Sequence, residues 1–286
     1  MTIKIVTDST CDLPIALINR YDISVIPQYI NIGDQEYQDG VDLSKQEFYK
    51  RLPQFHPSPT TAAPGPDVFK RLYERLATQG ATEILSIHIS VKLSSTVNIA
   101  RQAATETSLI PVTVFDSRQL SLGTGFEVIT AAKAAKLGKT MQEIIELLDD
   151  QISRTYVFAA LDTLEFLRRS GRMNTAISRF GELLQIKPLL YMFEGNPTAE
   201  RVRTQKNAIK RVVELLKEAS PLEQVAILHS NAADRARILL DEIKPLLPDG
   251  KKIIFEEITP VLGAHLGPGV IGFACISQKK RMELNI

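Results

Sequence analysis

The sequence predicts an α/β protein of two domains, the first with a mainly parallel sheet flanked by helices and the second with a mixed sheet and helices. In roughly the first 150 residues, apolar runs of strand length alternate with amphipathic helical segments, which is typical of a parallel sheet. Two strand-like runs joined through a Gly-containing turn near residue 195 indicate an antiparallel hairpin in the second half. A length of 286 residues suits two medium-sized domains.

The first half is predicted to begin with a strand and then to alternate. Predicted strands cover residues 3–6, 24–32, 84–89 and 112–116. A helix is expected after Asp12 as its N-cap, with Pro14 in its first turn. Asp67 is expected to cap a helix that runs to about residue 77, and a further helix is expected over about 95–105. Capping boxes at 44–47 and 140–143 open two more helices, and an Ala-rich helix ends near Gly138.

The second half mixes strand directions. Strands are predicted at 155–160, 186–193, 198–202, 225–229, 252–257 and 270–276, and helices at 162–169 and about 175–184, with others between the later strands. The pattern changes near residue 154, so we predict domains at 1–153 and 154–286.

Composition excludes several function classes. Lys and Arg number 34 against 33 Asp and Glu, a net charge of +1, so no basic surface for nucleic acid is indicated. The two cysteines, Cys11 and Cys275, imply neither a disulfide framework nor a zinc cluster, and we expect both to be small buried residues. The opening residues lack a signal-peptide pattern and no apolar run could span a bilayer. We therefore expect a cytoplasmic protein with no integral membrane span.

The stretch 83–98 is the first candidate for a functional site. A buried strand breaks into a hydroxyl-rich loop and then into a helix, which carries Ser94, Ser95 and Thr96 to the carboxyl edge of the predicted sheet. The free N–H groups of the helix start favour a small anion there. For any one of these hydroxyls, simple helix capping is the more common role. Three in a row after a buried strand favour a ligand contact for at least one.

Two further segments place polar groups beside predicted strands or in an unusual loop. Asp8, Ser9 and Thr10 follow the first strand at the same sheet edge. Residues 53–66 contain five prolines, a density that disfavours regular structure, and present Thr60 and Thr61 midway. This loop is either functional or a plain surface connector, and the sequence does not decide between the two.

Two basic or titratable residues lie in Gly-rich settings of the second half. His265 lies in segment 263–269, interpreted as a loop that allows close backbone approach. Arg172 follows Gly171 and either pairs with the end of the preceding helix or faces a ligand anion. A basic run over 201–211 is most simply a solvated face, although cations near a helix start hint at an acidic partner.

Several chemical motifs can be rejected. Residues 267–272 match G-x-G-x-x-G but continue as a strand, which excludes the dinucleotide fingerprint, and no Walker A sequence occurs. The four histidines lack metal-ligand spacing, so no metal or cofactor is predicted. Ser94 does not lie in a G-x-S-x-G elbow. A Ser94–His265 pair formed in space remains an open alternative.

Five segments taken together resemble the DegV family over essentially the whole chain. Residues 8–14 resemble its opening D-S-x-x-D-L-P, 59–64 its P-x-T-S-Q-P loop and 89–96 its I-S-S-x-L-S-G-T loop. Residues 170–172 and 265–269 resemble its later G-R and H-x-G-P-G signatures. Five matches in the right order make the resemblance specific.

The resemblance implies a two-domain α/β protein that binds one long-chain fatty acid and presents its carboxylate to a separate ATP-dependent fatty acid kinase. Such a protein is a non-catalytic subunit with no cofactor, and the fatty acid is its ligand. The resemblance also implies that Thr61 and Ser94 hydrogen-bond the carboxylate, with Arg172 and His265 at or near it. Asp8, Ser9, Ser95 and Thr96 would form the surrounding layer. Two departures stand out: Ala62-Ala63 replaces Ser-Gln, and Ser95 replaces Gly.

Two other functions remain open on the sequence. An acyl hydrolase or transferase would use Ser94 as nucleophile and His265 as base. A related protein that binds another amphipathic acid is the third possibility, suggested by the altered Ala62-Ala63.

Overall fold

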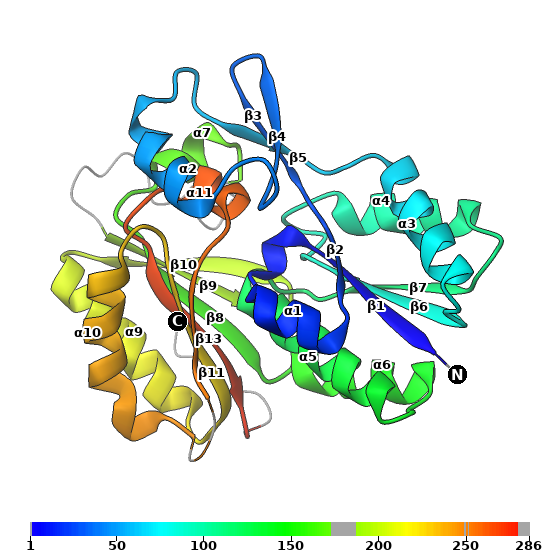
Figure 1. Ribbon diagram of the computed structural model, residues 1–286. Helices are drawn as coiled ribbons and strands as arrows, with labels where there is room; N and C mark the ends of the chain where they lie inside the picture. The colour runs from blue at the N-terminus through cyan, green and yellow to red at the C-terminus, as the bar shows by residue number, and fades with distance from the viewer. Residues whose placement is uncertain (1, 173–186, 249, 251, 280–286) are drawn as a thin grey trace.

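The computed structural model describes residues 2–172, 187–248, 250 and 252–279. Two larger sheets and one small sheet, with helices packed on them, make up the described chain (Figure 1). The strands of the first main sheet come from residues 3–116 and those of the second from residues 155–277. The α/β fold class with a parallel first sheet and a mixed second sheet is confirmed. The domain boundary at 153/154 stays a prediction.

The first main sheet is wholly parallel, in the order β2-β1-β6-β7. Its strands are β1 (Ile3–Asp8), β2 (Ser24–Ile26), β6 (Glu83–His88) and β7 (Val112–Asp116). One face packs on α3 (Pro66–Thr78) and α4 (Thr96–Glu106), and the other on α5 (Leu122–Lys136), beside which lie α1 (Ile15–Tyr21) and α6 (Met141–Ile152). Because all four strands run the same way, their carboxyl ends meet at one edge.

The second main sheet has the order β10-β9-β8-β13-β11-β12 and is antiparallel except for β11 and β12. Its strands are β8 (Thr155–Ala160), β9 (Lys187–Phe193), β10 (Asn196–Val202), β11 (Leu222–His229), β12 (Ile254–Glu257) and β13 (Ile271–Ser277). Helices α9 (Gln205–Ala219) and α10 (Ala233–Ile243), the latter followed by the 3₁₀ turn η3 (Lys244–Leu246), cover one face (Figure 1).

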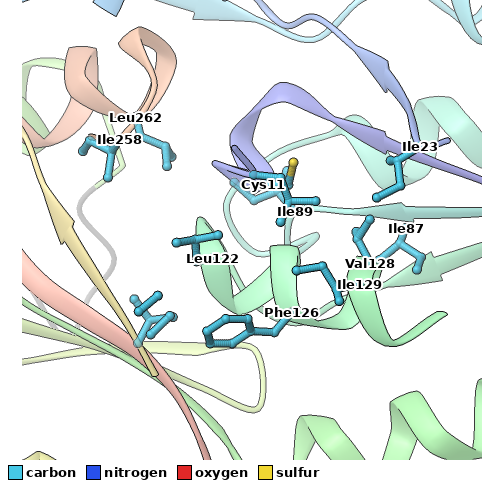
Figure 2. Close-up of a cluster of buried hydrophobic side chains, with 14 of the residues drawn as sticks. Cys11, Ile23, Ile87, Ile89, Leu122, Phe126, Val128, Ile129, Ile258 and Leu262 are labelled. Carbon is cyan, nitrogen blue, oxygen red and sulfur yellow. The ribbon is translucent and has the colours of Figure 1, made fainter. Parts of the chain in front are cut away.

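Helix α5 connects the two main sheets. It is apolar around much of its circumference, as expected for a helix buried on several sides. Figure 2 shows Leu122 and Phe126 of α5 in one buried cluster with Ile87 of β6 and with Leu262, which comes from the second half of the chain. A single core therefore crosses from one sheet to the other.

A third, antiparallel sheet was not foreseen. It has the order β4-β3-β5, made of β3 (Tyr29–Ile32), β4 (Gln35–Gln38) and β5 (Thr60–Ala62). Near it lie η1 (Ser9–Cys11), α2 (Lys45–Arg51), η2 (Leu52–Gln54), α7 (Glu165–Arg169) and α11 (Pro260–Leu266). Helix α11 contacts α2, β3, β5 and α7, so it joins the second half of the chain to the first.

Two strand predictions were wrong in the first half. The predicted strand 24–32 is two strands, because the chain breaks at Pro27 and Gln28 and pairs with different sheets on either side. The proline-rich segment 53–66 was expected to lack regular structure, but it contains β5 and part of η2. Both elements are compatible with the prolines, since β5 itself contains none and Pro53 lies in the first positions of η2.

Several predicted helix starts also need correction. Asp12 does not cap α1: it adopts a left-handed conformation (φ 53°), and its carboxylate accepts hydrogen bonds from Thr259 N (2.7 Å) and Ser121 Oγ. Helix α3 begins at Pro66 with Gly65 as N-cap, so Asp67 lies in its first turn instead of capping it. Of the two capping boxes, the one at Thr140 is complete.

The remaining differences are small. At the other predicted box, the Ser44 side chain accepts from Glu47 N, whereas the Glu47 side chain pairs with Arg51. Helix α7 starts three residues later than predicted, at Glu165, and β12 starts at Ile254. The predicted helix at 175–184 lies outside the described residues. Strands 112–116 and 155–160 and the antiparallel hairpin of β9 and β10 are confirmed.

Two predictions from composition can be compared with the structure. Cys11 and Cys275 are both buried and free, as expected. Within the part of the chain that the structure describes, no helix has the length and apolar character needed to cross a membrane.

Candidate functional site

A cavity of about 640 Å³ lies where the carboxyl ends of the first sheet meet the second sheet. The first half contributes Thr10 after β1, the loop 89–95 after β6, and Leu120 after β7. The second half contributes residues of β8, β9, β10, α7 and α11. This volume lies within the range of about 300–1,000 Å³ that is typical of small-molecule sites. The cavity is therefore large enough for a ligand and is built by both halves of the chain.

One wall of the cavity is apolar and comes mainly from the second sheet. In β8, Tyr156 and Phe158 pack on the side of α9, and Val157 and Ala159 line the cavity because side chains alternate along a strand. Leu190 and Met192 of β9, Leu120, and Val261, Leu262 and Leu266 of α11 extend this wall. The wall offers a ligand hydrophobic contact over several elements.

The loop after β6 forms a polar part of the opposite wall. Ser94 lines the cavity, and its Oγ forms a hydrogen bond with Thr96 Oγ1 (2.7 Å) and accepts one from Thr96 N (3.3 Å). Ser95 occupies the N-cap position of α4 but makes no side-chain capping bond. Ser94 therefore serves the helix start, because its Oγ accepts from the first N–H of α4, and it also lies in the cavity wall, where its contact with a ligand stays a prediction.

Thr61 and His265 contact each other in the cavity wall. Thr61 Oγ1, on β5, lies 2.8 Å from His265 Nε2 and within hydrogen-bonding distance of it. Burial, with a smaller effect of the Arg172 guanidinium, lowers the pKa of His265 to about 4. The imidazole is therefore neutral at pH 7, and it either accepts the Thr61 proton or donates its own to Thr61.

The surroundings of His265 correct one prediction. Segment 263–269 was expected to be a loop, but His265 lies in the last turn of α11. The expected close approach is nevertheless present. A Cβ atom on Gly263 would lie 2.5 Å from Tyr49 Oη, and one on Gly267 would lie 2.3 Å from the Phe166 ring. These two glycines let α11 sit against α2 and α7 with His265 facing Thr61.

Arg172 supplies a positive charge to the cavity wall. Its side chain is exposed, and Nη1 donates to the Ser170 carbonyl (2.7 Å), which leaves the other guanidinium nitrogens for further contacts. Because its charge lowers the pKa of His265, it acts on the same end of the cavity as the Thr61–His265 pair. Arg172 thus bonds to the end of the preceding helix, as one interpretation expected, and it lines the cavity, whereas its contact with a ligand anion stays a prediction.

Three of the four residues expected in the surrounding layer lie behind the wall. Asp8 is fully buried; burial favours a raised pKa, but hydrogen bonds from His88 Nδ1 (2.9 Å), Thr10 and Ile89 N (3.2 Å) keep it below its usual value. Ser9 Oγ accepts from the backbone of Gln28, and Thr96 is fully buried beside Ser94. Only Ser95 reaches the cavity wall.

The hydroxyl and imidazole groups were also compared with the arrangement that a serine hydrolase needs. His265 Nε2 bonds to Thr61, and Ser94 Oγ bonds to Thr96, so the nucleophile–base contact of a Ser94–His265 pair is not formed. A Ser86–His88–Asp8 chain does have the distances of a triad (2.7 and 2.9 Å), but all three side chains are fully buried. In the described residues, no group of three or more His, Cys, Asp or Glu side chains is placed to hold a metal ion.

Comparison with known proteins identifies the family of this chain. A family model described as an uncharacterised protein family, DegV, matches residues 2–278. This chain belongs to the DegV family. A DegV domain-containing protein of Streptomyces coelicolor is 34% identical over 280 residues, which covers 96% of this chain and 99% of that protein.

Solved DegV structures have the same fold. A DegV family protein from Thermus thermophilus, whose structure is described as showing fatty acid binding, has a TM-score of 0.88 and 34% identity, with 97% of this chain and 100% of that chain covered. DegV of Bacillus subtilis, described as a fatty acid binding protein, has a TM-score of 0.87 and 29% identity, with the same coverage.

All five DegV-like segments lie at or beside the cavity of this DegV protein, although they are far apart in sequence. Sequence reasoning placed Thr10 at the sheet edge beside Asp8 and Ser9, but it did not foresee Gln28, Tyr191 or Thr198 in the wall. Gln28 is a polar residue in the middle of the apolar run 24–32, and this signal could have singled it out.

Proposed function

We propose that this protein binds one long-chain fatty acid in the cavity and presents its carboxylate to a separate ATP-dependent fatty acid kinase, which forms the acyl phosphate. The observation that supports this best is the lining of the cavity, which combines an apolar wall with the polar side chains of Thr61, Ser94, His265 and Arg172. The fatty acid binding described for DegV proteins of Thermus thermophilus and Bacillus subtilis agrees with this ligand class.

The apolar wall would supply most of the affinity. Burial of one methylene group contributes about 0.8 kcal/mol, so a chain of about fourteen contributes on the order of 11 kcal/mol before the costs of association. Side chains from β8, β9 and α11 provide the hydrophobic surface for this chain. Chain length, and not the head group, would therefore dominate the binding free energy.

The polar side chains would orient the carboxylate and prevent its burial without partners. A carboxylate only accepts hydrogen bonds, so each neighbouring group must supply a proton. If neutral His265 donates from Nε2 to Thr61, the Thr61 hydroxyl proton is directed to the carboxylate. Ser94 donates in the same way only when Thr96 turns its single hydroxyl proton from Gln28 Oε1 to Ser94 Oγ. The exposed Arg172 adds an attractive charge.

Two features of the chain support the proposed presentation of the fatty acid to a kinase. The sequence has no Walker A phosphate loop, so the proposal assigns the ATP chemistry to another protein. Ser95, Lys92 and Arg172 line the cavity and are exposed, which puts this end of the cavity within reach of a partner. No cofactor enters the proposal, and the fatty acid is the ligand.

The decisive experiment is mass spectrometry on protein from a heterologous bacterial host, first under native conditions and then after organic extraction. One added mass per chain that extracts as a free fatty acid is expected. Protein without ligand that also takes up no added palmitate would contradict the binding proposal. The kinase step is tested separately: loaded protein, a bacterial fatty acid kinase and ATP should yield an acyl phosphate that hydroxylamine traps as a hydroxamate. Its absence with a kinase that phosphorylates the fatty acid on its own binding protein would contradict presentation.

A further inference from the structure

Gln28 is a polar residue of the cavity wall whose side chain is only partly satisfied. It lies between β2 and β3 and is 3% exposed. Its backbone is paired, since N donates to Ser9 Oγ (3.1 Å) and the carbonyl accepts from Asp39 N (2.9 Å). Its Oε1 accepts from Thr96 Oγ1 (3.4 Å). Its Nε2 has no hydrogen-bond partner among the residues that the structure describes.

An unpartnered amide nitrogen of this kind calls for an acceptor. Buried donors almost always find a partner in protein, water or ligand, because leaving one unpaired is costly. Gln28 is connected to the polar side chains of the cavity through Thr96, which also bonds to Ser94. The hydroxyls of Ser94 and Thr61 can donate to a ligand only when a neighbour supplies the proton of their existing pair. The two amide protons of Gln28 need no such supply, so they can serve a ligand without breaking a hydrogen bond.

The pairing of β3 with β5 gives a second, independent observation. The ladder ends with the pair Tyr29 and Ala62, and Gln28 and Ala63 are the next residues on the two chains, so continuing the register by one step sets them opposite each other. Directly opposed residues project to the same face, with Cβ atoms about 5 Å apart. Both residues line the cavity. Position 63 is where the DegV pattern P-x-T-S-Q-P has glutamine and this chain has alanine.

We propose that Gln28 is a head-group-binding residue, which donates its side-chain amide to the ligand carboxylate beside Ser94 and replaces, from the opposite strand, the glutamine missing at position 63. The proposal rests on the proposed function, because it concerns the same end of the same cavity. The terminal amide turns about a soft sp³–sp² torsion, so it reaches a nearby acceptor without a change of rotamer at the earlier torsions. Such a donor favours an ionised carboxylate, which accepts but cannot donate.

Gln151 of α6 offers a matched control. It is 4% exposed, its Oε1 accepts from a threonine hydroxyl, Thr130 Oγ1 (2.7 Å), and its Nε2 also lacks a partner within the described chain. It differs from Gln28 in not belonging to the cavity wall. Replacing either glutamine by leucine therefore removes the same chemistry, but only one replacement touches the proposed head-group site.

The test compares palmitate with methyl palmitate, both measured by displacement of a fluorescent fatty acid. Gln28→Leu should weaken palmitate binding by about ten- to a hundredfold, the range expected for a hydrogen bond to a charged group, and leave the ester within about twofold. Gln151→Leu should leave both unchanged. Equal losses for acid and ester would reduce Gln28 to a packing residue, and unchanged palmitate binding by Gln28→Leu would also overturn the proposal.

A rescue experiment tests the cross-strand replacement. Adding Ala63→Gln to Gln28→Leu should restore palmitate affinity to within about threefold of the wild type, whereas failure to restore it in a folded double variant would contradict the replacement. If Gln28→Leu does not fold, Gln28→Glu serves instead. It keeps the size of the side chain but sets a carboxylate against the ligand, so palmitate should bind more than about a hundredfold more weakly at pH 8. Absence of palmitate binding by the wild type would contradict the proposed function itself, whereas wild-type binding with unaffected Gln28 variants would contradict only the role of Gln28.

Discussion

The two main sheets contribute to the cavity in different ways. The first sheet contributes its edge: the loops after β1, β6 and β7 bring hydroxyl groups and the start of α4. The second sheet contributes a face, where Val157 and Ala159 of β8 lie beside side chains of β9. A parallel sheet gathers strand ends and helix N-termini at one edge, which suits an anion, whereas an antiparallel face presents every second side chain and suits an extended apolar chain. If the edge binds the head group and the face binds the acyl chain, variants of the edge should change the affinity for the carboxylate. Variants of the face should change the dependence of affinity on chain length.

The largest expected effect comes from blocking the face. Ala159→Trp should fill part of the apolar wall and displace about five methylenes, a loss of about 4 kcal/mol, or roughly a thousandfold in palmitate affinity. Decanoate, which is shorter, should keep most of its affinity. Competition against a fluorescent fatty acid measures both. Ala135→Trp, at a half-buried alanine of α5 outside the wall, is the control, and an equal loss of decanoate and palmitate would contradict a role for the face in reading chain length.

The next largest effect is expected in the pH dependence of folding stability, through His265. Burial lowers the pKa of His265 from 6.5 to about 4, so the unfolded chain binds more protons in this window and stability should fall as pH drops from 6.5 to 4. The contribution is at most about 3 kcal/mol. Burial raises the pKa of Asp12 to about 7, which acts in the opposite direction, so stability from this group falls as pH rises from about 4 to 7.

The two contributions can be separated by urea unfolding at pH 4.5 and pH 7. His265→Gln should lose less stability than the wild type on acidification, because the buried imidazole is gone, while Asp12 is common to both proteins. The same pH dependence in the variant and the wild type would show that His265 is not held neutral by burial.

Variants of the two cavity hydroxyls, Ser94 at the edge of the first sheet and Thr61 on β5, should have intermediate effects on palmitate affinity. Ser94→Ala and Thr61→Val should each weaken palmitate binding by about ten- to a hundredfold, since each removes a hydrogen bond to a charged group. Only Ser94→Ala should also loosen α4, by about 1 kcal/mol, because it removes the acceptor for Thr96 N. Hydrogen exchange in the first turn of α4 distinguishes the two. Unchanged palmitate affinity in both variants would remove the hydroxyls from the site.

The smallest effect on palmitate affinity is expected at Arg172, whose charge is exposed. Arg172→Gln should weaken palmitate binding by no more than about fivefold, and the loss should shrink at 1 M salt, because exposed charges are well screened. The same variant should raise the pKa of His265, since the repulsion from the guanidinium is removed. Titration of the His265 ring by NMR checks this shift. A loss of palmitate affinity that does not depend on salt would instead indicate that Arg172 contacts the carboxylate out of reach of solvent.

The sequence predicted regular elements better than their ends and partners. Strands 112–116 and 155–160 were predicted to the residue, because each is an apolar run between clear breaks. The run 24–32 was misread as one strand, since nothing local shows that the two sides of Pro27 join different sheets. Asp12 was misread as a helix cap for a related reason, because its hydrogen-bond partners Ser121 and Thr259 are more than a hundred residues away.

For the site, the chain's motifs determined which residues to examine, and only the tertiary structure decided how they meet. The pattern of hydroxyls after a buried strand singled out Ser94, and the family resemblance added Thr61, Arg172 and His265. The bond between Thr61 and His265 joins positions 204 residues apart, and the burial that keeps His265 neutral depends on α11 seated against the first half of the chain. Strand pairing likewise brought Tyr29 beside Ala62, next to Gln28 and Ala63. Local patterns encode helices, strands and polar turns, whereas contacts, burial and proton positions arise only when distant segments pack together.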